Sequence, residues 1–171
     1  DSQFHDYKAA LEEYNRAVEL NPCFADAFYN RAYLLEDRFQ DYPKALEDYN
    51  RAIELKQDSE YYNNRAILLK NHFGEYQKSL EDFNTSIQLN PNRSSHYKNR
   101  GILLKYQLKR YEEAIKDFDE AIRLSPSSKA ICYVQKSHTY LLMGNLHEAK
   151  VWFEKASKIN DSISLARYVW G

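Results

Sequence analysis

Residues 42–55 read YPKALEDYNRAIEL, and nearly the same apolar pattern returns as YQKSLEDFNTSIQL at 76–89 and YEEAIKDFDEAIRL at 111–124. Two further copies, at 7–20 and 146–159, flank these three. One small residue of the pattern marks the period, because it recurs in steps of 35, 34, 35 and 35 residues. This column holds Ala10, Ala45, Ser79, Ala114 and Ala149. A fixed period of this length predicts a solenoid of stacked units that share one continuous core.

Each period contains two segments with helical spacing of apolar residues, so each unit is predicted to be a helical hairpin. The first segment around Ala66 and the second segment through Leu80, Phe83 and Ile87 show this spacing. Proline disfavours a helical residue before it, which predicts helix ends at Leu20, Leu89 and Leu124. Side-chain oxygens are expected to cap the helices that follow, at Asp58-Ser59, Ser94-Ser95 and Ser127-Ser128.

Small and large side chains alternate between the two helices of each hairpin. Glycine inside a helix costs about 1 kcal/mol relative to alanine, so Gly101 predicts a close helix contact that a larger side chain would block. The small column on the first helices holds Ala32, Ala66, Gly101 and Ser137. The aromatic column on the second helices holds Tyr14, Tyr49, Phe83, Phe118 and Phe153. Such alternation is what interdigitating helices require.

These columns resemble the tetratricopeptide repeat over almost the whole chain. The resemblance rests on the small residue, the leucine or tyrosine after it, and the aromatic before it, which is Phe28, Tyr62, Tyr97 or Tyr133. It implies an all-α fold, a right-handed superhelical solenoid of antiparallel helix pairs. The sequence departs from the family pattern in the turn between the helices, which carries one extra residue in the first three full copies.

Both ends look cut from the interior of an array, so we expect a fragment of a longer one. The expected organisation is the second helix of a truncated repeat at 1–22, repeats at 23–57, 58–91, 92–126 and 127–160, and the start of a further helix or a capping helix at 161–171.

Composition favours a protein partner over nucleic acid. The chain has 24 Lys and Arg against 25 Asp and Glu, a formal net charge of −1, which argues against an extended phosphate-binding surface. Pentatricopeptide RNA-binding repeats share a similar period, but the spacing of the small and aromatic columns and the absence of a basic excess disfavour them.

Cysteine usage and hydropathy favour a cytoplasmic chain. Cys23 and Cys132 lie in different repeats, which supports neither a disulfide framework nor a metal site. No apolar run approaches the roughly 18 residues that cross a bilayer. We therefore expect reduced cysteines, no cofactor and no membrane insertion, with a cilium or the cytoskeleton as a second possible setting.

No catalytic pattern is found in the sequence. The five histidines fall in different columns, none belongs to a His-Glu-x-x-His motif, and four glycines are too few for a phosphate-binding loop. We expect the protein not to be an enzyme.

Cations on the first helices and acids on the second helices form two regular columns. If each cation paired within its own repeat, Lys136 would face Trp152 and Glu13 would have no partner. Because a buried charge without a partner is costly, pairing across repeat boundaries is predicted. The predicted pairs are Glu13 with Arg31, Asp48 with Arg65, Asp82 with Arg100, and Asp117 with Lys136. Solvated charges on two helix faces are the alternative.

The resemblance implies a concave groove, lined by the first helices, that binds a peptide or a partner helix. The side chains expected on it are Asp26, Tyr29, Asn30, Tyr33, Asn63, Asn64, Ile67, Lys70, Lys98, Asn99, Ile102, Lys105 and Gln135. This row begins acidic and aromatic and becomes basic. Asn30, Asn64 and Asn99 suit an extended backbone, since an amide both donates and accepts; helix capping is the alternative role.

Some family members hold the acidic C-terminus of chaperones with a two-carboxylate clamp. Tyr33, Ile67 and Ile102 stand where one clamp asparagine is usual, so a chaperone adaptor is not expected. The predicted function is a non-catalytic scaffold for protein interactions. The alternative is a permanently packed structural segment of a large ciliary or cytoskeletal assembly.

Overall fold

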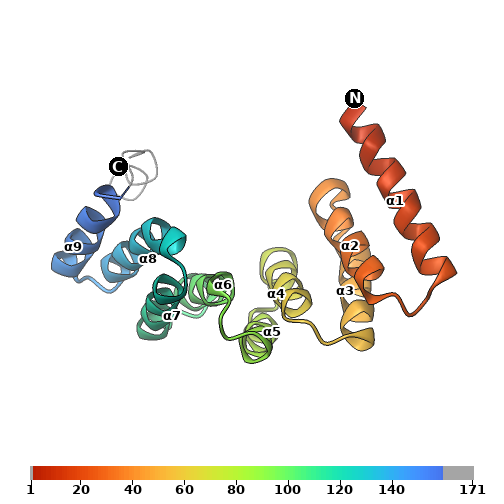
Figure 1. Cartoon of the computed structure of the whole chain (residues 1–171). Coiled ribbons are helices and arrows are strands. Elements are labelled where there is room, and N and C mark those ends of the chain that lie inside the picture. The colour runs from red at the N-terminus through yellow and green to blue at the C-terminus, as the bar shows by residue number, and fades with distance from the viewer. Residues whose placement is uncertain (1, 160–171) are drawn as a thin grey trace. The chain divides into compact units, whose positions relative to one another are not determined.

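The computed structural model describes residues 2–159, which form helices and connecting turns without any strand. The chain divides into two compact units, Asp1–Leu89 and Asn90–Gly171. Within each unit, consecutive helices lie side by side as antiparallel pairs (Figure 1). The expected all-α architecture of helix pairs is therefore confirmed. The further or capping helix expected at 161–171 lies outside the described residues.

Unit 1 begins with a single helix and continues with two helix pairs. In each pair, the first helix ends in a short π-helical turn. The elements are α1 (Ser2–Leu20), α2 (Ala25–Leu34), η1 (Leu35–Phe39), α3 (Tyr42–Leu55), α4 (Ser59–Leu68), η2 (Leu69–Phe73) and α5 (Tyr76–Leu89). In sequence order, α2 pairs with α3 and α4 with α5, while α1 packs on α2 and α3 on α4.

Unit 2 contains two helix pairs joined by a short 3₁₀ turn. The elements are α6 (Ser94–Tyr106), α7 (Tyr111–Leu124), η3 (Pro126–Ser128), α8 (Lys129–Leu142) and α9 (Leu146–Ser157). Helix α6 pairs with α7 and α8 with α9, and α7 packs against α8.

Helix ends follow the proline rule, whereas only one of the three predicted caps forms. The helices end at Leu20, Leu89 and Leu124 as predicted. Asp58 caps α4 by accepting a hydrogen bond from the backbone N–H of Glu60 at 3.0 Å. The capping roles predicted in unit 2 are wrong, because neither α6 nor α8 has a side-chain cap. Ser94 Oγ instead donates to the carbonyl of Ala121 at 2.9 Å and lies 2.7 Å from Ser128 Oγ, since packing against α7 brings a competing acceptor within reach.

The extra residue of the first three turns is absorbed by a wider backbone loop. The N–H of Asp41 donates to the carbonyl of Leu35, six residues earlier, at 3.0 Å, and Glu75 and Arg110 repeat this bond to Leu69 and Leu104. In the last turn, the corresponding bond spans five residues, from Asn145 to Tyr140. Each loop ends in the left-handed region, at Gln40 (φ 55°), Gly74 (φ 66°), Lys109 (φ 54°) and Gly144 (φ 77°). The insertion therefore lengthens the turn without breaking either helix.

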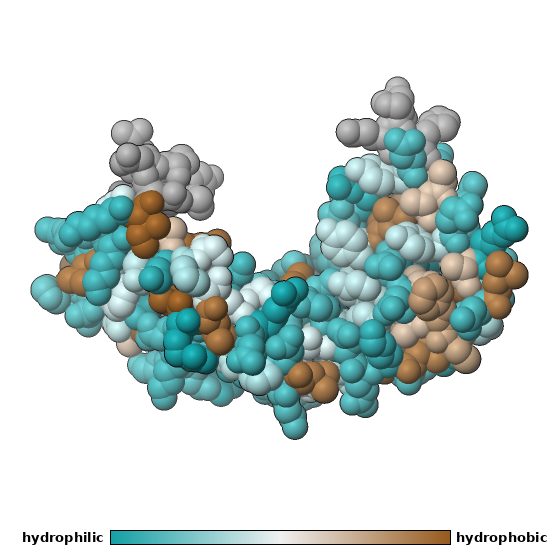
Figure 2. All heavy atoms as spheres, in the orientation of Figure 1, coloured by the Kyte–Doolittle hydropathy of each residue, from teal (hydrophilic) through white to brown (hydrophobic). Residues whose placement is uncertain are grey.

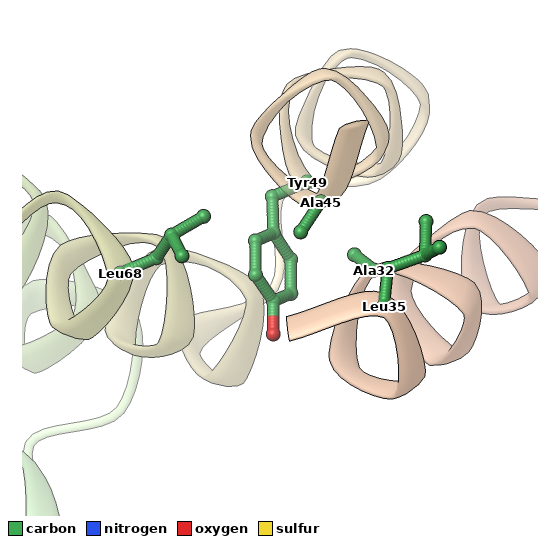
Figure 3. Packing of buried hydrophobic residues seen from close by; sticks show 5 residues of the cluster. All are labelled: Ala32, Leu35, Ala45, Tyr49 and Leu68. Atoms are coloured by element: carbon green, nitrogen blue, oxygen red, sulfur yellow. The ribbon is translucent and has the colours of Figure 1, made fainter. Parts of the chain in front are cut away.

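The core of unit 1 is built by the small and aromatic columns. Figure 3 shows the ring of Tyr49, on α3, reaching between Ala32 and Leu35 on one side and Leu68 of α4 on the other. Tyr49 and Ala32 are fully buried. Because Tyr49 contacts both first helices of the unit, one aromatic side chain joins two successive repeats. The serines in the small columns bond to carbonyls: Ser79 Oγ donates to Ala66 O at 2.8 Å.

The close contact predicted at Gly101 is confirmed. A Cβ atom added to Gly101 would lie 2.7 Å from Cε1 of Phe118, whose side chain is fully buried. Carbon atoms pack at about 3.5–4.0 Å. The small column of unit 2 therefore has no room for even a methyl group at this position.

The three arginines pair with aspartates of their own repeats, so the predicted pairing is wrong for them. Lys136 does pair across a repeat boundary, but with Asp119 and not with the predicted Asp117. Arg31 donates from Nε and Nη2 to the two carboxylate oxygens of Asp48, both at 2.7 Å. The same two-bond geometry joins Arg65 to Asp82 and Arg100 to Asp117. In unit 1 each of these arginines also contacts the preceding second helix. Arg31 Nη1 donates to Asn15 Oδ1 at 3.0 Å, and Arg65 Nη1 donates to Asn50 Oδ1 at 2.9 Å.

Pairing within repeats had been rejected because it leaves Glu13 without a partner and places Lys136 opposite Trp152. In the structure neither arrangement leaves a buried charge uncompensated. Glu13, which was expected to need a partner, is exposed to solvent. Lys136 does face Trp152, with Nζ 3.4 Å from the ring centroid, and it also donates to Asp119 at 2.6 Å. A cation over an indole ring is attracted by the ring's quadrupole, so Trp152 and Asp119 together replace the missing aspartate.

Candidate binding surface

A network of tyrosines and acids connects α2 and α4, the first helices of unit 1. The rings of Tyr29 and Tyr61 stack with centroids 4.6 Å apart and an interplanar angle of 22°. The Tyr61 hydroxyl donates to Asp26, and Lys56 forms an ion pair with the same carboxylate at 3.3 Å. The hydrogen bond from Tyr61 holds the pKa of Asp26 below its usual value. The network therefore holds one aromatic face and one carboxylate in place between two repeats.

Asn64 of α4 is oriented by two hydrogen bonds. Its Nδ2 donates to the hydroxyl of Tyr29 at 2.8 Å, and its Oδ1 accepts from Nδ2 of Asn63 at 3.0 Å. Burial and nearby acids, Glu60 first among them, raise the pKa of Tyr29 to about 12. Tyr29 thus remains a neutral hydroxyl that links the two helices.

Glu36 lies at the end of the buried Tyr49 ring, where α2 continues into η1. The Tyr49 hydroxyl donates to Glu36 Oε2 at 2.9 Å. Burial raises the pKa of Glu36, and burial together with Glu36 raises that of Tyr49. The surface of unit 1 is therefore acidic and aromatic at this point.

Unit 2 carries a buried lysine where unit 1 carries Glu36. Lys105 is 1% exposed and donates to Oε1 of Gln135 on α8. Its Nζ lies 3.9 Å from the Tyr106 ring centroid and 5.9 Å from that of Phe118. Burial lowers the pKa of Lys105 to about 7, so the low-polarity surroundings favour its neutral form.

Tyr106 and His138 form the exposed edge of this lysine site. The Tyr106 hydroxyl lies 2.9 Å from His138 Nδ1, and the two rings meet edge to face. Burial, with Lys105 nearby, lowers the pKa of His138. At the start of α6, Lys98 lines a separate polar hollow of about 470 Å³ with Arg93, Ser94 and Ser128.

Between residues 2 and 159, no helix is long and apolar enough to cross a membrane, and no group of His, Cys, Asp and Glu side chains is placed to hold a metal ion. Both cysteines are free. In the face shown in Figure 2, hydrophobic residues lie in small separate groups among hydrophilic ones.

Two family models match the sequence. The model described as "Tetratricopeptide repeat" matches residues 25–59, 99–128 and 130–162, and the model described as "TPR repeat" matches residues 6–37. These segments cover more than half of the chain. The chain belongs to the tetratricopeptide repeat (TPR) family. The resemblance found in the sequence is confirmed, and the chain is a protein-interaction scaffold of the TPR type.

Solved TPR structures share the fold at low sequence identity. MamA from Desulfovibrio magneticus RS-1 superposes with a TM-score of 0.82 at 14% identity, over 92% of this chain and 88% of that one. YrrB, described as a TPR protein with an unusual peptide-binding site, gives 0.81 at 20% identity, over 98% and 84%. PilW, a type IV pilus biogenesis factor, gives 0.79 at 21% identity, over 92% and 71%. A search of curated protein sequences finds no match.

The TPR register places four residues in one partly or fully buried column, and three of them are charged. This column lies four residues after the small column and holds Glu36, Lys70, Lys105 and Leu141. Burial raises the pKa of Glu36 and lowers that of Lys70 and of Lys105. Within this column the side chain is acidic at Glu36 and basic at Lys70 and Lys105.

The surface positions expected for Asn63 and Lys105 are wrong. Asn63 is 4% exposed and Lys105 is 1% exposed. Both were placed by helical periodicity, which treats a helix as isolated. Lys105 is buried against Gln135 of the next first helix, α8. Of the other expected residues of unit 1, Asp26, Asn30 and Tyr33 are exposed, while Tyr29, Asn64, Ile67 and Lys70 are half-buried.

The contacts of two buried tyrosines beneath this TPR surface were not predicted. Tyr49 was assigned to the core alone, and Tyr61 was not singled out. A signal for Tyr49 existed, since its hydroxyl has no counterpart in Phe83, Phe118 or Phe153, and a buried hydroxyl needs a polar partner. No sequence signal indicated Tyr61, because its stacking on Tyr29 depends on how two repeats pack.

Replacing Lys105 with methionine is expected to stabilise this TPR chain by about 2–4 kcal/mol at neutral pH, because the lowered pKa corresponds to about 4 kcal/mol and the lost hydrogen bond to Gln135 offsets part of it. Methionine fills a similar space without a buried charge. The folded-state pKa of about 7 lies below the unfolded value of about 10.4. Between these values the unfolded wild type binds the proton and the folded protein does not, so wild-type stability rises with pH.

Urea unfolding followed by circular dichroism at several pH values tests this prediction. The advantage of Lys105→Met should be largest below about pH 7 and should shrink as the pH rises toward about 10.4. Lys150→Met, an exposed change on α9, is the control and should leave stability almost unchanged. An advantage that is independent of pH would contradict the assignment of a low pKa to Lys105.

Proposed function

We propose that the first helices of this TPR chain bind a peptide or a helix of a protein partner. The observation that carries the proposal is the Tyr29–Asn64 hydrogen bond of 2.8 Å, together with the stacking of Tyr29 on Tyr61. These contacts join α2 to α4 with polar and aromatic groups in a half-buried layer. Tyr33 lies above this layer and is 53% exposed. Tyrosine offers a large contact area and few rotatable bonds, which suits it to protein recognition.

The second helices expose a different kind of surface. Their outward side chains form pairs of opposite charge one turn apart, Arg51 with Glu54, Arg110 with Glu113 and Arg123 with Glu120. Exposed pairs of this kind are well solvated and contribute little to stability. The first-helix side also carries an exposed pair, Asp37 with Arg38, but it adds the tyrosine and asparagine contacts. These contacts support a binding role for the first helices, as does the peptide-binding site of the TPR protein YrrB.

A peptide-display selection on the full chain tests which surface binds. We expect the selected peptides to bind the Tyr33→Ala variant about tenfold more weakly or worse, because exposed aromatic anchors dominate many interfaces. Tyr76→Ala is the matched control, since Tyr76 is also exposed but begins the second helix α5. Peptides that lose affinity for Tyr76→Ala and keep it for Tyr33→Ala would contradict the proposal.

The alternative, a segment packed permanently in a large assembly, differs in the lifetime of the complex. Peptides in a groove should dissociate within the time of a competition experiment, whereas a structural neighbour should not exchange. The exposed Tyr33 and Tyr106 suit both functions. A cytoplasmic location, a non-catalytic role and a partner that is not nucleic acid stay predictions.

A further inference from the structure

A small pocket opens on unit 1 between the end of α2 and the middle of α4. Its volume is about 120 Å³, and it is lined by Tyr33, Glu36, Asp37, Asn64 and Ile67. Sites for small-molecule ligands usually enclose about 300–1,000 Å³, and a single water needs only about 10–15 Å³. The size of this pocket therefore suits one side chain of a partner rather than a cofactor or a water molecule.

The polar side of the pocket is the carboxylate of Glu36, which forms no ion pair within residues 2–159. Glu36 accepts one hydrogen bond, from the Tyr49 hydroxyl at 2.9 Å, and no lysine or arginine within residues 2–159 forms an ion pair with it. The nearest cation in sequence, Arg38, pairs instead with Asp37 at 2.7 Å and lies over the Tyr7 ring. Burial and the neighbouring charge of Asp37 raise the pKa of Glu36, the Tyr49 hydrogen bond lowers it, and no cation is among these causes.

Other acidic side chains on unit 1 add negative charge near the pocket. Glu60, Asp58 and Glu36 all raise the pKa of Tyr29, and no cation is among the groups that act on it. The Tyr33 ring forms the outer wall and is 53% exposed. The face of an aromatic ring attracts cations, and it attracts the planar guanidinium of arginine most readily. Ile67 adds an apolar side against which the methylene groups of an arginine can pack.

We propose that this pocket binds an arginine side chain of the protein partner, with the guanidinium between the Tyr33 ring and the Glu36 carboxylate. The inference rests on the proposed binding role of the first helices and names the chemistry that this part of unit 1 recognises. An acidic occupant would be repelled by Glu36. An apolar occupant would bury Glu36 further without a counter-charge, which is costly. The arginine guanidinium supplies both the positive charge and two parallel N–H donors for the carboxylate.

An NMR titration of the full chain with N-acetyl-arginine amide tests the proposal. The side-chain amide of Asn64 and the methyl groups of Ile67, both at the pocket, should shift and saturate. The matching citrulline compound has nearly the same shape without the charge, and it should bind at least about tenfold more weakly. Glu36→Gln should lower the affinity for the arginine probe by about tenfold as well, because it removes the charge while leaving an acceptor for Tyr49.

Glu47→Gln is the control for overall charge, since Glu47 is an exposed residue of α3 outside the pocket, and it should bind the arginine probe like the wild type. If Glu36→Gln fails to fold, Tyr33→Leu carries the test: it changes an exposed side chain and should weaken arginine binding, whereas Tyr33→Phe should not. Equal binding of the citrulline compound, unchanged affinity in Glu36→Gln, or no shift at Asn64 and Ile67 would each overturn the proposal.

This titration and the peptide selection can fail separately. If the arginine probe binds saturably but the selected peptides do not depend on Tyr33, the arginine pocket is kept and the wider binding role is rejected. Peptides that depend on Tyr33 but bind Glu36→Gln as well as the wild type would reject the arginine pocket and keep the binding role.

Discussion

Asp48→Ala is expected to lower the free energy of unfolding by about 3–5 kcal/mol, because it leaves a buried charge without its partner. The side chain of Arg31 is only 12% exposed, and that of Asp48 only 6%. Both carboxylate oxygens accept hydrogen bonds from the guanidinium at 2.7 Å. After the substitution, Asn15 is the remaining hydrogen-bond partner of Arg31, and a neutral amide cannot balance the charge. Urea unfolding followed by circular dichroism measures the loss.

The same helix offers a matched control. Glu54 pairs with Arg51 at 3.1 Å, and both side chains are well exposed, at 65% and 44%. Glu54→Ala should change stability by less than about 0.5 kcal/mol. Replacing both Arg31 and Asp48 with apolar residues of similar size should recover most of the loss, since buried ion pairs contribute little net stability. A cost for Asp48→Ala no larger than that for Glu54→Ala would contradict the importance of the buried pair.

Gly101→Val is expected to destabilise unit 2 by about 2–3 kcal/mol. The Cβ atom alone would lie 2.7 Å from the ring of Phe118, which is fully buried and cannot move into solvent. Valine adds two more carbons at this contact and also lowers helix propensity. The loss should be seen as a lower urea midpoint and as faster amide exchange in α6 and α7.

A double-substitution cycle separates the steric clash from helix propensity. Alanine favours a helix over glycine by about 1 kcal/mol, so Gly101→Ala would stabilise the protein if space allowed. We expect Gly101→Ala to destabilise the wild type and to stabilise the Phe118→Leu background, where the ring is absent. The same sign in both backgrounds would show that the Phe118 contact does not decide the choice of glycine.

The sequence allowed the scaffold to be predicted because its signals are local or strictly periodic. Proline placed the ends of α1, α5 and α7, and the recurring small residues located the helix contacts, including the one at Gly101. The extra residue in three turns was also visible in the sequence. Its conformation was not, since a wider turn that ends in the left-handed region at Gln40 or Lys109 is one of several ways to absorb an insertion.

The partners of the ion pairs could not be predicted from the aligned columns of the repeats. Counting acids and cations treated Glu13 as a charge in need of a partner and Trp152 as unable to satisfy Lys136. The structure leaves Glu13 in solvent and places Lys136 over the indole ring. Asn15 and Asn50 make the contacts between repeats that were assigned to Glu13 and Asp48. A neutral amide does not enter a count of charges, and burial cannot be read from a column.

By itself the sequence determined the repeat, the helix pairs, the family and the set of residues on the first helices, because all of these follow from spacing along one chain. Only the tertiary structure decided which of those residues remain accessible and what they contact. Asn63 and Lys105 are buried, Tyr49 reaches Glu36, and Asn64 is held by Tyr29. These features depend on the distance and rotation between neighbouring helices, and changes of a few ångströms there decide whether a charge is exposed or buried and whether a core tyrosine reaches a carboxylate.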